Sequence, residues 1–550
     1  MAALIFASNP ASIPASFASA YNAHPKLIVV IVIDQFRADY LERYRDQFGE
    51  GGFRLLLDHG ANFTDCNYDY ANTRTAPGHA TLFTGTYSNG HGIVANEWWD
   101  PKKKRMVTSV EDDDAKLVGI APDQTKDKTG ASPHNLLADT LGDELKLATQ
   151  GQARVFSLSL KDRAAILPGG FAADAAYWID PKSGAWTTST YYRRDLPKWA
   201  QDFNAGNRAA KFWDRDWKNS NGDVLRSTAH RKGKDGSDAG FYEVVGSTPF
   251  ANEYELEFAK ELVVYENLGA GQATDLLAIS LSPNDILGHQ VGPDSPEMAA
   301  MALALDRELA DFFSFLGHQV GLANTWIALS ADHGVSALPD AAKKLRIPAA
   351  NLGAGKSETL INTALTAKFS QGHATSYIKL DYPVAWLDED AFAAVHVKEH
   401  DAETAVGEAM MQAGLLRQYF TKSQLADGAA PNAALGKKFL NSYSPEGGWY
   451  VLGVPEIYTV GSATGTDHAS PYTYDTHVPL AFYGLPFRPG TYRTHAEPVD
   501  LAVTLASLLG INAPTHAVGR VLTEALVPSH HPENAAASAN VASPNGGAPQ

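Results

Sequence analysis

Aspartate and histidine residues recur in this sequence in short motifs whose spacing suits divalent metal ions. Three carboxylates and three imidazoles, with no thiolate, form a mixed oxygen and nitrogen donor set that is sufficient for two Zn²⁺ ions. Two metal ions about 3.5 to 4 Å apart can clamp the attacking and leaving oxygens of an in-line phosphoryl displacement. The residues are Asp34, Asp285 and His289 in an Asp-x-x-x-His loop, Asp332 and His333 as a dipeptide, and His468 in Thr-Asp-His.

A hydroxyl that could serve such a centre lies in segment 72–79, Asn-Thr-Arg-Thr-Ala-Pro-Gly-His. We expect Thr75 at or near the start of a helix, with Pro77 and Gly78 shaping the entry. A helix N-terminus offers unpaired N–H groups and the positive end of the helix dipole, which favour an alkoxide and phosphate oxygens. A coordinated metal lowers the pKa of a hydroxyl and replaces a general base. Thr75 is therefore the candidate nucleophile, although the segment alone would indicate only a helix cap.

Two cations, Lys161 and Arg163, follow an apolar run and are two residues apart. On an extended backbone, residues with this spacing point to the same face. Two positive charges suit the two charged nonbridging oxygens of a phosphate monoester, whereas a diester carries one charge fewer. The pair therefore favours monoester hydrolysis.

Short apolar runs that do not alternate with polar residues are typical of strands covered on both faces, and amphipathic helical patterns lie between them. This alternation predicts an α/β fold with a mainly parallel central sheet, helices on both faces, and inserted loops or a subdomain. Four of the five runs are followed by a polar residue suited to chemistry, and the carboxyl ends of parallel strands meet in one crevice. The expected strands are 27–33, 154–160, 276–282, 325–331 and 478–484, and the expected helices include 133–149, 296–317 and 498–510.

Composition excludes several classes of partner. The chain has 62 acidic and 45 basic residues among 550, a net charge of -17, and its only short basic run is 102–105. Nucleic-acid binding needs clustered positive charge, so it is not expected. No uninterrupted apolar stretch is long enough for a transmembrane helix. The acidic run 111–114 could hold a structural Ca²⁺, although such runs are usually only solvated.

The two ends differ in composition from the rest. Residues 1–24 are small, apolar and serine-rich, and we interpret them as a leader or signal remnant, which predicts a periplasmic or secreted protein. Residues 528–550 lack apolar periodicity and are expected to form a disordered tail. One catalytic domain, 25–527, lies between them, and we expect a monomer.

In this order and number, the motifs resemble the alkaline phosphatase superfamily over roughly residues 26–515. They are the segment around Thr75, Thr-Gly-x₅-His-Gly-Ile-x₂-Asn ending at Asn96, the Asp-x-x-x-His pair, Asp-His-Gly and Thr-Asp-His. The chain is similar to the bacterial phosphatases with a threonine nucleophile, which also resemble nucleotide pyrophosphatase/phosphodiesterases. The resemblance implies an alkaline phosphatase-like fold.

The resemblance also assigns roles. It implies that Asn96 donates its amide to a nonbridging phosphate oxygen, and that Lys161 and Arg163 bind substrate. It favours His468 over His477, nine residues later, as the last imidazole and implies an extended backbone between the two. One zinc ion would be held by Asp34, Thr75, Asp332 and His333, and the other by Asp285, His289 and His468.

The resulting hypothesis is a zinc-dependent phosphatase that hydrolyses a broad range of small phosphate monoesters through a phosphothreonine intermediate. A phosphodiesterase of the nucleotide pyrophosphatase type is the alternative. A non-catalytic metal-binding protein of the same fold is a third reading, but it would lack a nucleophile or a ligand, and the sequence lacks neither. A sulfatase is not expected, because Thr75-Ala-Pro-Gly-His79 has neither the modifiable Cys or Ser nor the following Arg.

Overall fold

The computed structural model describes residues 24–120, 129–233, 236–370, 372–431 and 433–527. The expected leader, apart from residue 24, and the expected tail lie outside these ranges. Within them, the largest unit is a ten-stranded sheet with the order β22-β2-β21-β14-β1-β13-β8-β9-β10-β6. Among the described residues, no helix combines the length and the apolar character that a membrane span requires.

The centre of the sheet is built from the apolar runs seen in the sequence. β1 (Leu27–Ile33) has every residue buried, which explains its unbroken apolar character. It pairs in parallel with β13 (Asp275–Leu281) and β14 (Thr325–Ser330), and β13 pairs in parallel with β8 (Val155–Ser159). The fifth run forms β21 (Leu480–Tyr483), which is antiparallel to β14. The sheet is therefore mixed and parallel at its centre.

The outer strands complete the sheet on both sides. β9 (Ala175–Ile179) continues the parallel core from β8. β10 (Trp186–Ser189) is antiparallel to β9, and β6 (Leu117–Val118) is antiparallel to β10. On the other side, β2 (Ala61–Phe63) is antiparallel to β21 and parallel to β22 (Gly490–Tyr492).

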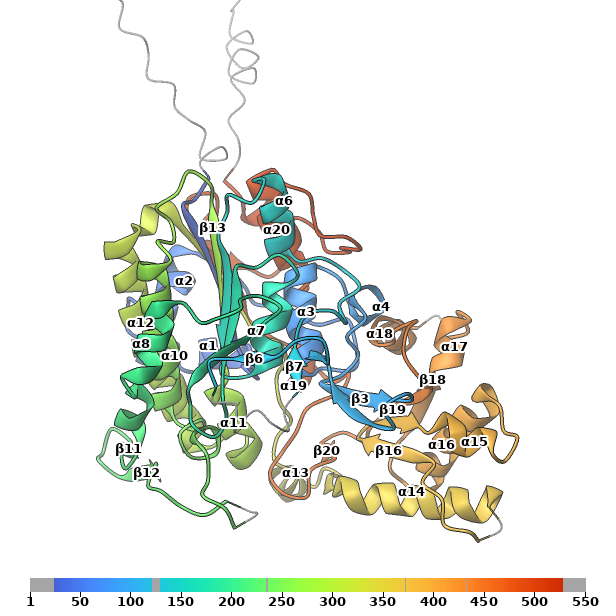
Figure 1. Ribbon diagram of the computed structural model, residues 1–550. Helices are drawn as coiled ribbons and strands as arrows, with labels where there is room; N and C mark the ends of the chain where they lie inside the picture. Colours follow the sequence, from blue (N-terminus) through green and yellow to red (C-terminus); the bar gives the residue numbers. More distant parts are fainter. Residues whose placement is uncertain (1–23, 121–128, 234–235, 371, 432, 528–550) are drawn as a thin grey trace, which may run out of the picture.

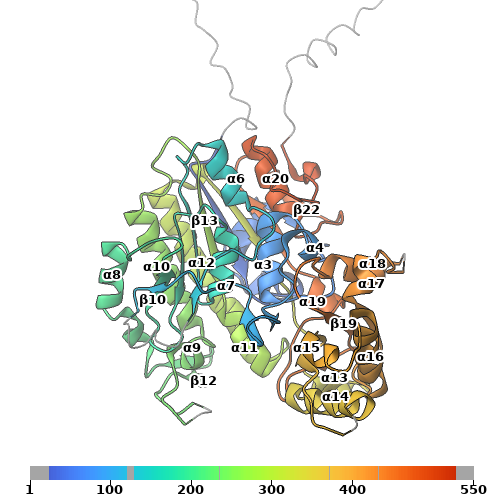
Figure 2. The same cartoon turned by 45° about the vertical axis from the view of Figure 1, so that its right-hand side comes forward.

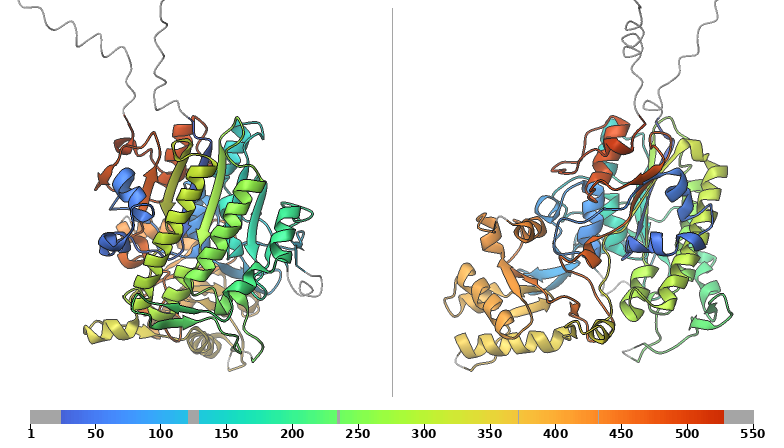
Figure 3. Two further views of the ribbon diagram at one scale, coloured as in Figure 1. Left: turned by 90° about the vertical axis from the view of Figure 1, so that its left-hand side faces the viewer. Right: turned by 180° about the vertical axis from the view of Figure 1, so that it is seen from behind.

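Helices cover both faces of this sheet, as predicted. One face carries α10 (Pro249–Tyr265) and α12 (Pro296–Gln319), the long green and yellow-green helices in front of the sheet in the left view of Figure 3. The other face carries α3 (Thr75–Thr84), α7 (Asp162–Gly169) and α20 (Asp500–Leu509) (Figure 2). The helices α10, α12, α3 and α20 bury apolar side chains in one core with the strands, whereas α7 packs in a smaller cluster with β9 and the first turns of α3.

The helix expected over 133–149 is shorter than predicted. α6 covers only Leu141–Ala148, because Thr140 caps it. The Thr140 side chain accepts from the Asp143 N–H while the Asp143 carboxylate accepts from the Thr140 N–H, a capping box that fixes the start of the helix.

An inserted lobe, residues 354–454, lies beside the main sheet (Figure 1, yellow and orange). Its antiparallel sheet has the order β16-β17-β19-β18, formed by Ile378–Asp381, Val384–Leu387, Tyr450–Val454 and Gln418–Thr421. The helices α14 (Ala354–Phe369) and α16 (Glu399–Gln412) pack on it around a separate apolar core. At the base of the lobe, β15 (Ala350–Asn351) pairs in parallel with β20 (Thr459–Val460), which joins the two ends of the insertion.

The basic and acidic runs near residue 100 neutralise each other. Residues 101–104 form the turn of a hairpin between β3 (Glu97–Asp100) and β4 (Arg105–Thr108). Lys103 and Arg105 both pair with Glu111, and Lys103 also pairs with Asp113. Glu111 and Asp113 thus have cationic partners, and a calcium site at 111–114 stays a prediction.

Helix α3 approaches the end of β14 so closely that only glycine fits at the crossing. A Cβ on Gly78 would lie 2.3 Å from the carbonyl oxygen of Asp332. The close approach brings the start of α3 to the carboxyl edge of the sheet.

We expect Gly78→Ala to lower the free energy of unfolding by about 1 to 3 kcal/mol, because an added methyl group must displace backbone in a packed core. Gly355→Ala, in the first turn of α14 with nothing within 4 Å of its Cβ position, is the control and should be neutral or slightly stabilising. Urea unfolding of both variants gives the comparison. Similar values for the two would mean that α3 can move away from β14 without cost.

Candidate active site

The residues predicted to act in catalysis or metal binding lie together at one edge of the sheet. Asp34 follows β1, Asp332 follows β14 and Lys161 follows β8, and these strands point the same way. Asp285 lies in the first turn of α11 (Pro283–Val291), which follows β13. The carboxyl edge of the parallel core therefore gathers them, as the topology predicts.

The first donor group consists of Asp34, Asp332 and His333. One ligand atom from each lies within 4.8 Å of the other two, and all three residues are fully buried. Asp34 Oδ1, Asp332 Oδ2 and His333 Nε2 have no hydrogen-bond partner among the described residues. Buried polar atoms are normally paired, so three unpaired ligand atoms within 4.8 Å of one another indicate a missing ligand.

The second predicted donor group consists of Asp285, His289 and His468. Its ligand atoms lie in two overlapping clusters, Asp285 with His333 and His468, and His289 with Asp467 and His468. His289 Nε2 is 3.1 Å and His468 Nε2 is 3.9 Å from Asp285 Oδ1. The loop expected for Asp285 and His289 is wrong, since both lie on helix α11, where a spacing of four residues places side chains on one face. The His333 and His468 rings stack at 3.7 Å, so the two groups adjoin each other.

The three imidazoles are oriented alike. The Nδ1 atoms of His289, His333 and His468 donate to the carbonyl oxygens of Thr466, Gly334 and Thr73, at 2.9, 2.9 and 2.6 Å respectively. This arrangement leaves each Nε2 facing the carboxylates, the orientation that metal-ligating histidines adopt. Burial lowers the pKa of His333 and His468, which keeps their Nε2 lone pairs available. The donor set and its orientation fit two zinc ions.

Burial and neighbouring charges shift the pKa values of the carboxylates and of His289. Burial, together with Asp285 and Asp332 nearby, raises the pKa of Asp34 well above its usual value. Burial would also raise the pKa of Asp285, but Lys161 and His289 outweigh it and hold the value well below normal. Burial opposes a charge on His289, yet Asp285 raises its pKa to about 10. Asp34 is therefore the one of these three groups whose charged form its surroundings do not favour.

His477 is not part of either donor group. Its Nε2 is 3.0 Å from the Thr64 carbonyl oxygen, and its backbone bridges to Asn67, so it holds a neighbouring segment in place. The extended backbone expected between His468 and His477 is wrong, since the chain forms the short helix α19 (Thr473–Thr476) there. His468 is the imidazole that reaches the site.

Thr75 is the first residue of α3 and is 1% exposed. His79, one turn later, donates from Nδ1 to the Thr75 carbonyl oxygen at 2.8 Å, and the same Nδ1 is 3.3 Å from Asp332 Oδ2. The first turn of α3 thus lies against the first donor group. This placement brings the Thr75 hydroxyl and the candidate metal ligands to one end of the helix.

The N-terminus of α3 offers fewer free amides than expected. The Ala76 N–H donates to Asn96 Oδ1 at 2.8 Å, Pro77 has no N–H, and the Gly78 N–H donates to the Arg74 carbonyl oxygen at 2.9 Å. Because Asn96 uses its carbonyl oxygen to cap the helix, its NH₂ group is the part that can donate to a ligand. This orientation is compatible with the role expected of the Asn96 amide, which stays a prediction.

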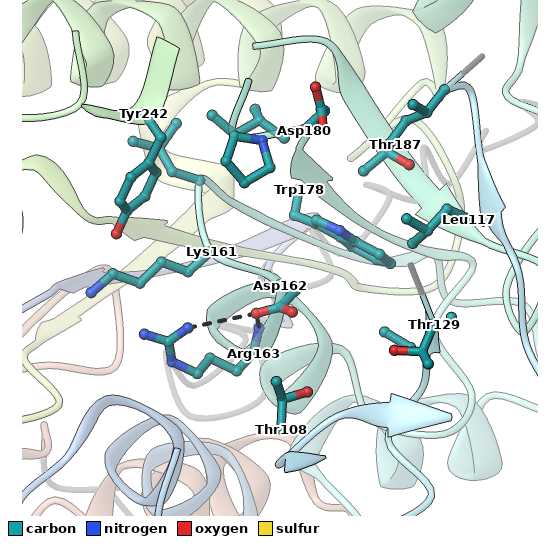
Figure 4. Close-up of a pocket in the computed structure, with 16 residues that line it drawn as sticks. Thr108, Leu117, Thr129, Lys161, Asp162, Arg163, Trp178, Asp180, Thr187 and Tyr242 are labelled. Atoms are coloured by element: carbon teal, nitrogen blue, oxygen red, sulfur yellow. Dashed lines mark hydrogen bonds and ion pairs between the residues drawn. The ribbon is translucent and has the colours of Figure 1, made fainter. Parts of the chain in front are cut away.

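Lys161 and Arg163 reach the same region, but not for the reason predicted. β8 ends at Ser159, Lys161 occupies the N-cap position of α7, and Arg163 is the second residue of that helix. The expectation that an extended backbone joins Lys161 and Arg163 is therefore wrong. Their side chains nevertheless extend in the same direction beside Tyr242 (Figure 4), and both line a cavity of about 480 Å³. Lys161 Nζ is 2.6 Å from both Asp34 Oδ2 and Asp285 Oδ2.

Some residues that organise the site were not identified from the sequence. Gln35 donates from its backbone N–H to Asp332 Oδ1 at 3.0 Å and from Nε2 to Asp285 Oδ1 at 2.7 Å, which links the two donor groups. It adopts a left-handed conformation with φ 64°, and no residue pattern signals this. His79 could have been found from its spacing to Thr75 on a helix. Asp467, beside His468, also lies within reach of the second donor group.

Comparisons with known proteins agree with this geometry. Residues 28–428 match the type I phosphodiesterase / nucleotide pyrophosphatase family. Alkaline phosphatase PhoV of Synechococcus elongatus is 34% identical, with 92% of this chain and 93% of the relative covered. Alkaline phosphatase PafA of Elizabethkingia meningoseptica is 32% identical, with 91% and 94% covered.

A crystal structure of wild-type PafA superposes with a TM-score of 0.81 at 30% identity, covering 92% of this chain and 99% of that structure. Murine ectonucleotide pyrophosphatase / phosphodiesterase 5 shares the fold, with a TM-score of 0.51 at 16% identity. These similarities extend over the sheet, the site and the inserted lobe. The chain therefore belongs to the type I phosphodiesterase / nucleotide pyrophosphatase family of the alkaline phosphatase superfamily.

Proposed function

We propose that this protein is a zinc-dependent alkaline phosphatase that hydrolyses phosphate monoesters through a phosphothreonine intermediate. The observation that carries the proposal is the meeting of two adjoining Asp/His donor groups with the start of α3, where Thr75 lies. Relatives that cover most of the chain are named alkaline phosphatases, which supports the same reaction.

The two donor groups are the proposed zinc ligands. Asp34, Asp332 and His333, together with Thr75, would hold one ion. Asp285, His289 and His468 would hold the other. When bound, the ions supply positive charge and Lewis acidity that lower the pKa of the nucleophilic hydroxyl and stabilise the charge of the leaving group.

The residues of this chain supply the nucleophile and position the phosphate. The Thr75 oxygen forms a bond to phosphorus while the bond to the ester oxygen breaks, and the alcohol leaves. Water then cleaves the phosphothreonine, which releases inorganic phosphate and restores the hydroxyl. Lys161 and Arg163 would neutralise the charge of the nonbridging oxygens and the Asn96 amide would donate a hydrogen bond to one of them, which suits a loose transition state that is stabilised mainly by charge and positioning.

A phosphodiesterase remains the second candidate, because the matched family is described by that activity. The two activities differ in the charge on the bound phosphoryl group. Arg163 tests this difference most directly. Its contact among the described acidic groups is Asp162 at 3.7 Å, whereas Lys161 contacts two proposed metal ligands, Asp34 and Asp285. Replacing Arg163 therefore disturbs the proposed metal ligands less.

Metal removal is expected to abolish hydrolysis of an aryl phosphate monoester, and added Zn²⁺ should restore it and raise the melting temperature, because cations relieve repulsion among buried carboxylates. His289→Ala should lose zinc and activity together. His318→Ala, an exposed histidine on α12, is the control and should retain both. Full activity in a protein shown to be metal-free by elemental analysis would refute the two-metal centre.

Thr75→Ala is expected to lower kcat/KM by about 10³-fold or more, since no other hydroxyl takes its place, while circular dichroism stays unchanged. Thr75→Ser should keep appreciable activity because a hydroxyl remains at the same position. Acid-quenched samples should contain phosphothreonine in the native protein only. An alanine variant as active as the native protein would show that the nucleophile is misassigned.

Arg163→Ala is expected to lower kcat/KM for a monoester by about 10- to 10²-fold, because a charge-assisted hydrogen bond contributes about 1.5 to 3 kcal/mol. Turnover of the corresponding methyl diester should change at most a few-fold. The ratio of the two constants is therefore the measurement. An equal fall for both substrates would indicate general damage to the site, and no fall in either would place Arg163 outside it and favour the phosphodiesterase.

A further inference from the structure

The segment that leads into Thr75, residues 68–74, belongs to no helix or strand. Two of its backbone N–H groups donate outside the lobe, from Tyr68 to the Thr476 carbonyl oxygen and from Asp69 to the Tyr87 hydroxyl. Three other backbone groups are bonded by side chains of the inserted lobe, all from one helix, α18 (Ala434–Ser442). The bonds are Lys438 Nζ to Tyr68 O at 2.7 Å, Asn441 Nδ2 to Asp69 O at 2.7 Å, and Ala71 N–H to Ser442 Oγ at 2.7 Å.

Arg74, the residue directly before Thr75, makes the most extensive of these contacts. Its Nη2 donates to the carbonyl oxygens of Asp381 and Tyr382 at 3.0 and 2.9 Å, and its Nη1 is 2.7 Å from Asp381 Oδ2. Its Nε donates to Asn72 Oδ1 at 2.8 Å. Arg74 is 7% exposed, so these bonds are shielded from water. A planar guanidinium with several bonds fixes both the position and the orientation of the backbone beside it.

The opposite side of the segment is bonded to the loop that carries His468. The Thr73 carbonyl oxygen accepts from His468 Nδ1 at 2.6 Å and from the Ala469 N–H at 3.1 Å. Thr73 Oγ1 donates to the Ser470 carbonyl oxygen at 3.1 Å. The segment is thus held between a proposed zinc ligand on one side and the inserted lobe on the other.

Apolar packing follows the same boundary. Ala71, Val94 and Ala95 share a buried cluster with Val384 and Tyr450 of the lobe. The lobe therefore packs against residues that closely precede Thr75 and against residues that directly precede Asn96. This contact between the lobe and the rest of the protein lies beside the candidate active site.

We propose that the inserted lobe is a positioning device for the nucleophile and that it acts through Arg74. The proposal rests on the assignment of Thr75 as the nucleophile. Without the lobe, segment 68–74 would lose the partners of the Tyr68 and Asp69 carbonyl oxygens, of the Ala71 N–H and of the Arg74 guanidinium. The Thr75 hydroxyl would then be held less firmly in line with the phosphorus atom. Misplacing a reacting atom by about 1 Å can cost about 10²-fold in rate.

The test separates positioning from metal binding and from phosphate binding. Arg74→Ala should lower kcat for an aryl phosphate monoester by about 10²-fold, with zinc content unchanged and with the inhibition constant of inorganic phosphate changed at most a few-fold. Arg74→Lys should resemble the alanine variant more than the native protein, because a single ammonium cannot reproduce the planar fork.

Two adjacent lysines give a matched pair within the lobe. Lys438→Ala removes the bond to the Tyr68 carbonyl oxygen and should lower kcat measurably. Lys437→Ala removes an ion pair with the Asp69 side chain, but the lysine is 64% exposed and, among the described residues, makes no bond to the backbone of the segment, so kcat should stay unchanged. Equal activity of these two variants would overturn the proposal, as would a loss of zinc in parallel with activity in the Arg74 variants.

Asp381→Asn provides a variant that weakens the Arg74 contact if Arg74→Ala fails to fold, and it should lower kcat in the same selective way. Thr75→Ala distinguishes this proposal from the function on which it rests. An active Thr75→Ala variant would refute the assignment of Thr75 as the nucleophile. An inactive Thr75→Ala variant, together with unaltered Arg74 and Asp381 variants, would remove only the role of the lobe.

Discussion

The repulsion among three buried carboxylates, Asp34, Asp285 and Asp332, is the interaction on which the rest of this structure depends. Each is almost fully excluded from water, and Lys161 is the cation that lies between two of them. An ionised carboxylate in a low-dielectric setting is costly unless it is paired. The imidazoles around this cluster face it with Nε2, which is the orientation that metal-ligating histidines adopt.

The sheet explains why such a cluster can exist. Strands β1, β13, β14 and β8 are fully buried and are fixed by neighbouring strands and covering helices, so their carboxyl ends are rigid platforms. Gln35 extends this rigidity into the site, since one residue bonds a carboxylate from each donor group. A Cβ on Gly288 would lie 2.0 Å from Gln35 Oε1, so a larger residue on α11 would have to displace the end of that side chain.

Much of this arrangement could be predicted from the sequence, because it rests on local signals. Unbroken apolar runs identified the central strands, and the residues that follow them identified most of the site. The left-handed conformation of Gln35, the helix under Asp285 and His289, and the start of α7 at Asp162 gave no comparable signal. The contacts of Arg74 with the lobe join residues more than 300 positions apart in the chain, and no periodic pattern encodes such bonds.

The short β15–β20 pair at the base of the lobe has a consequence for how the protein is made. It closes the insertion on itself, so the chain that departs after His333 returns to deliver His468 at the same place. During synthesis, a ribosome-bound chain that has reached the lobe carries the acidic cluster without its last imidazole. The second donor group can therefore be complete only after the chain beyond the lobe has returned to the sheet.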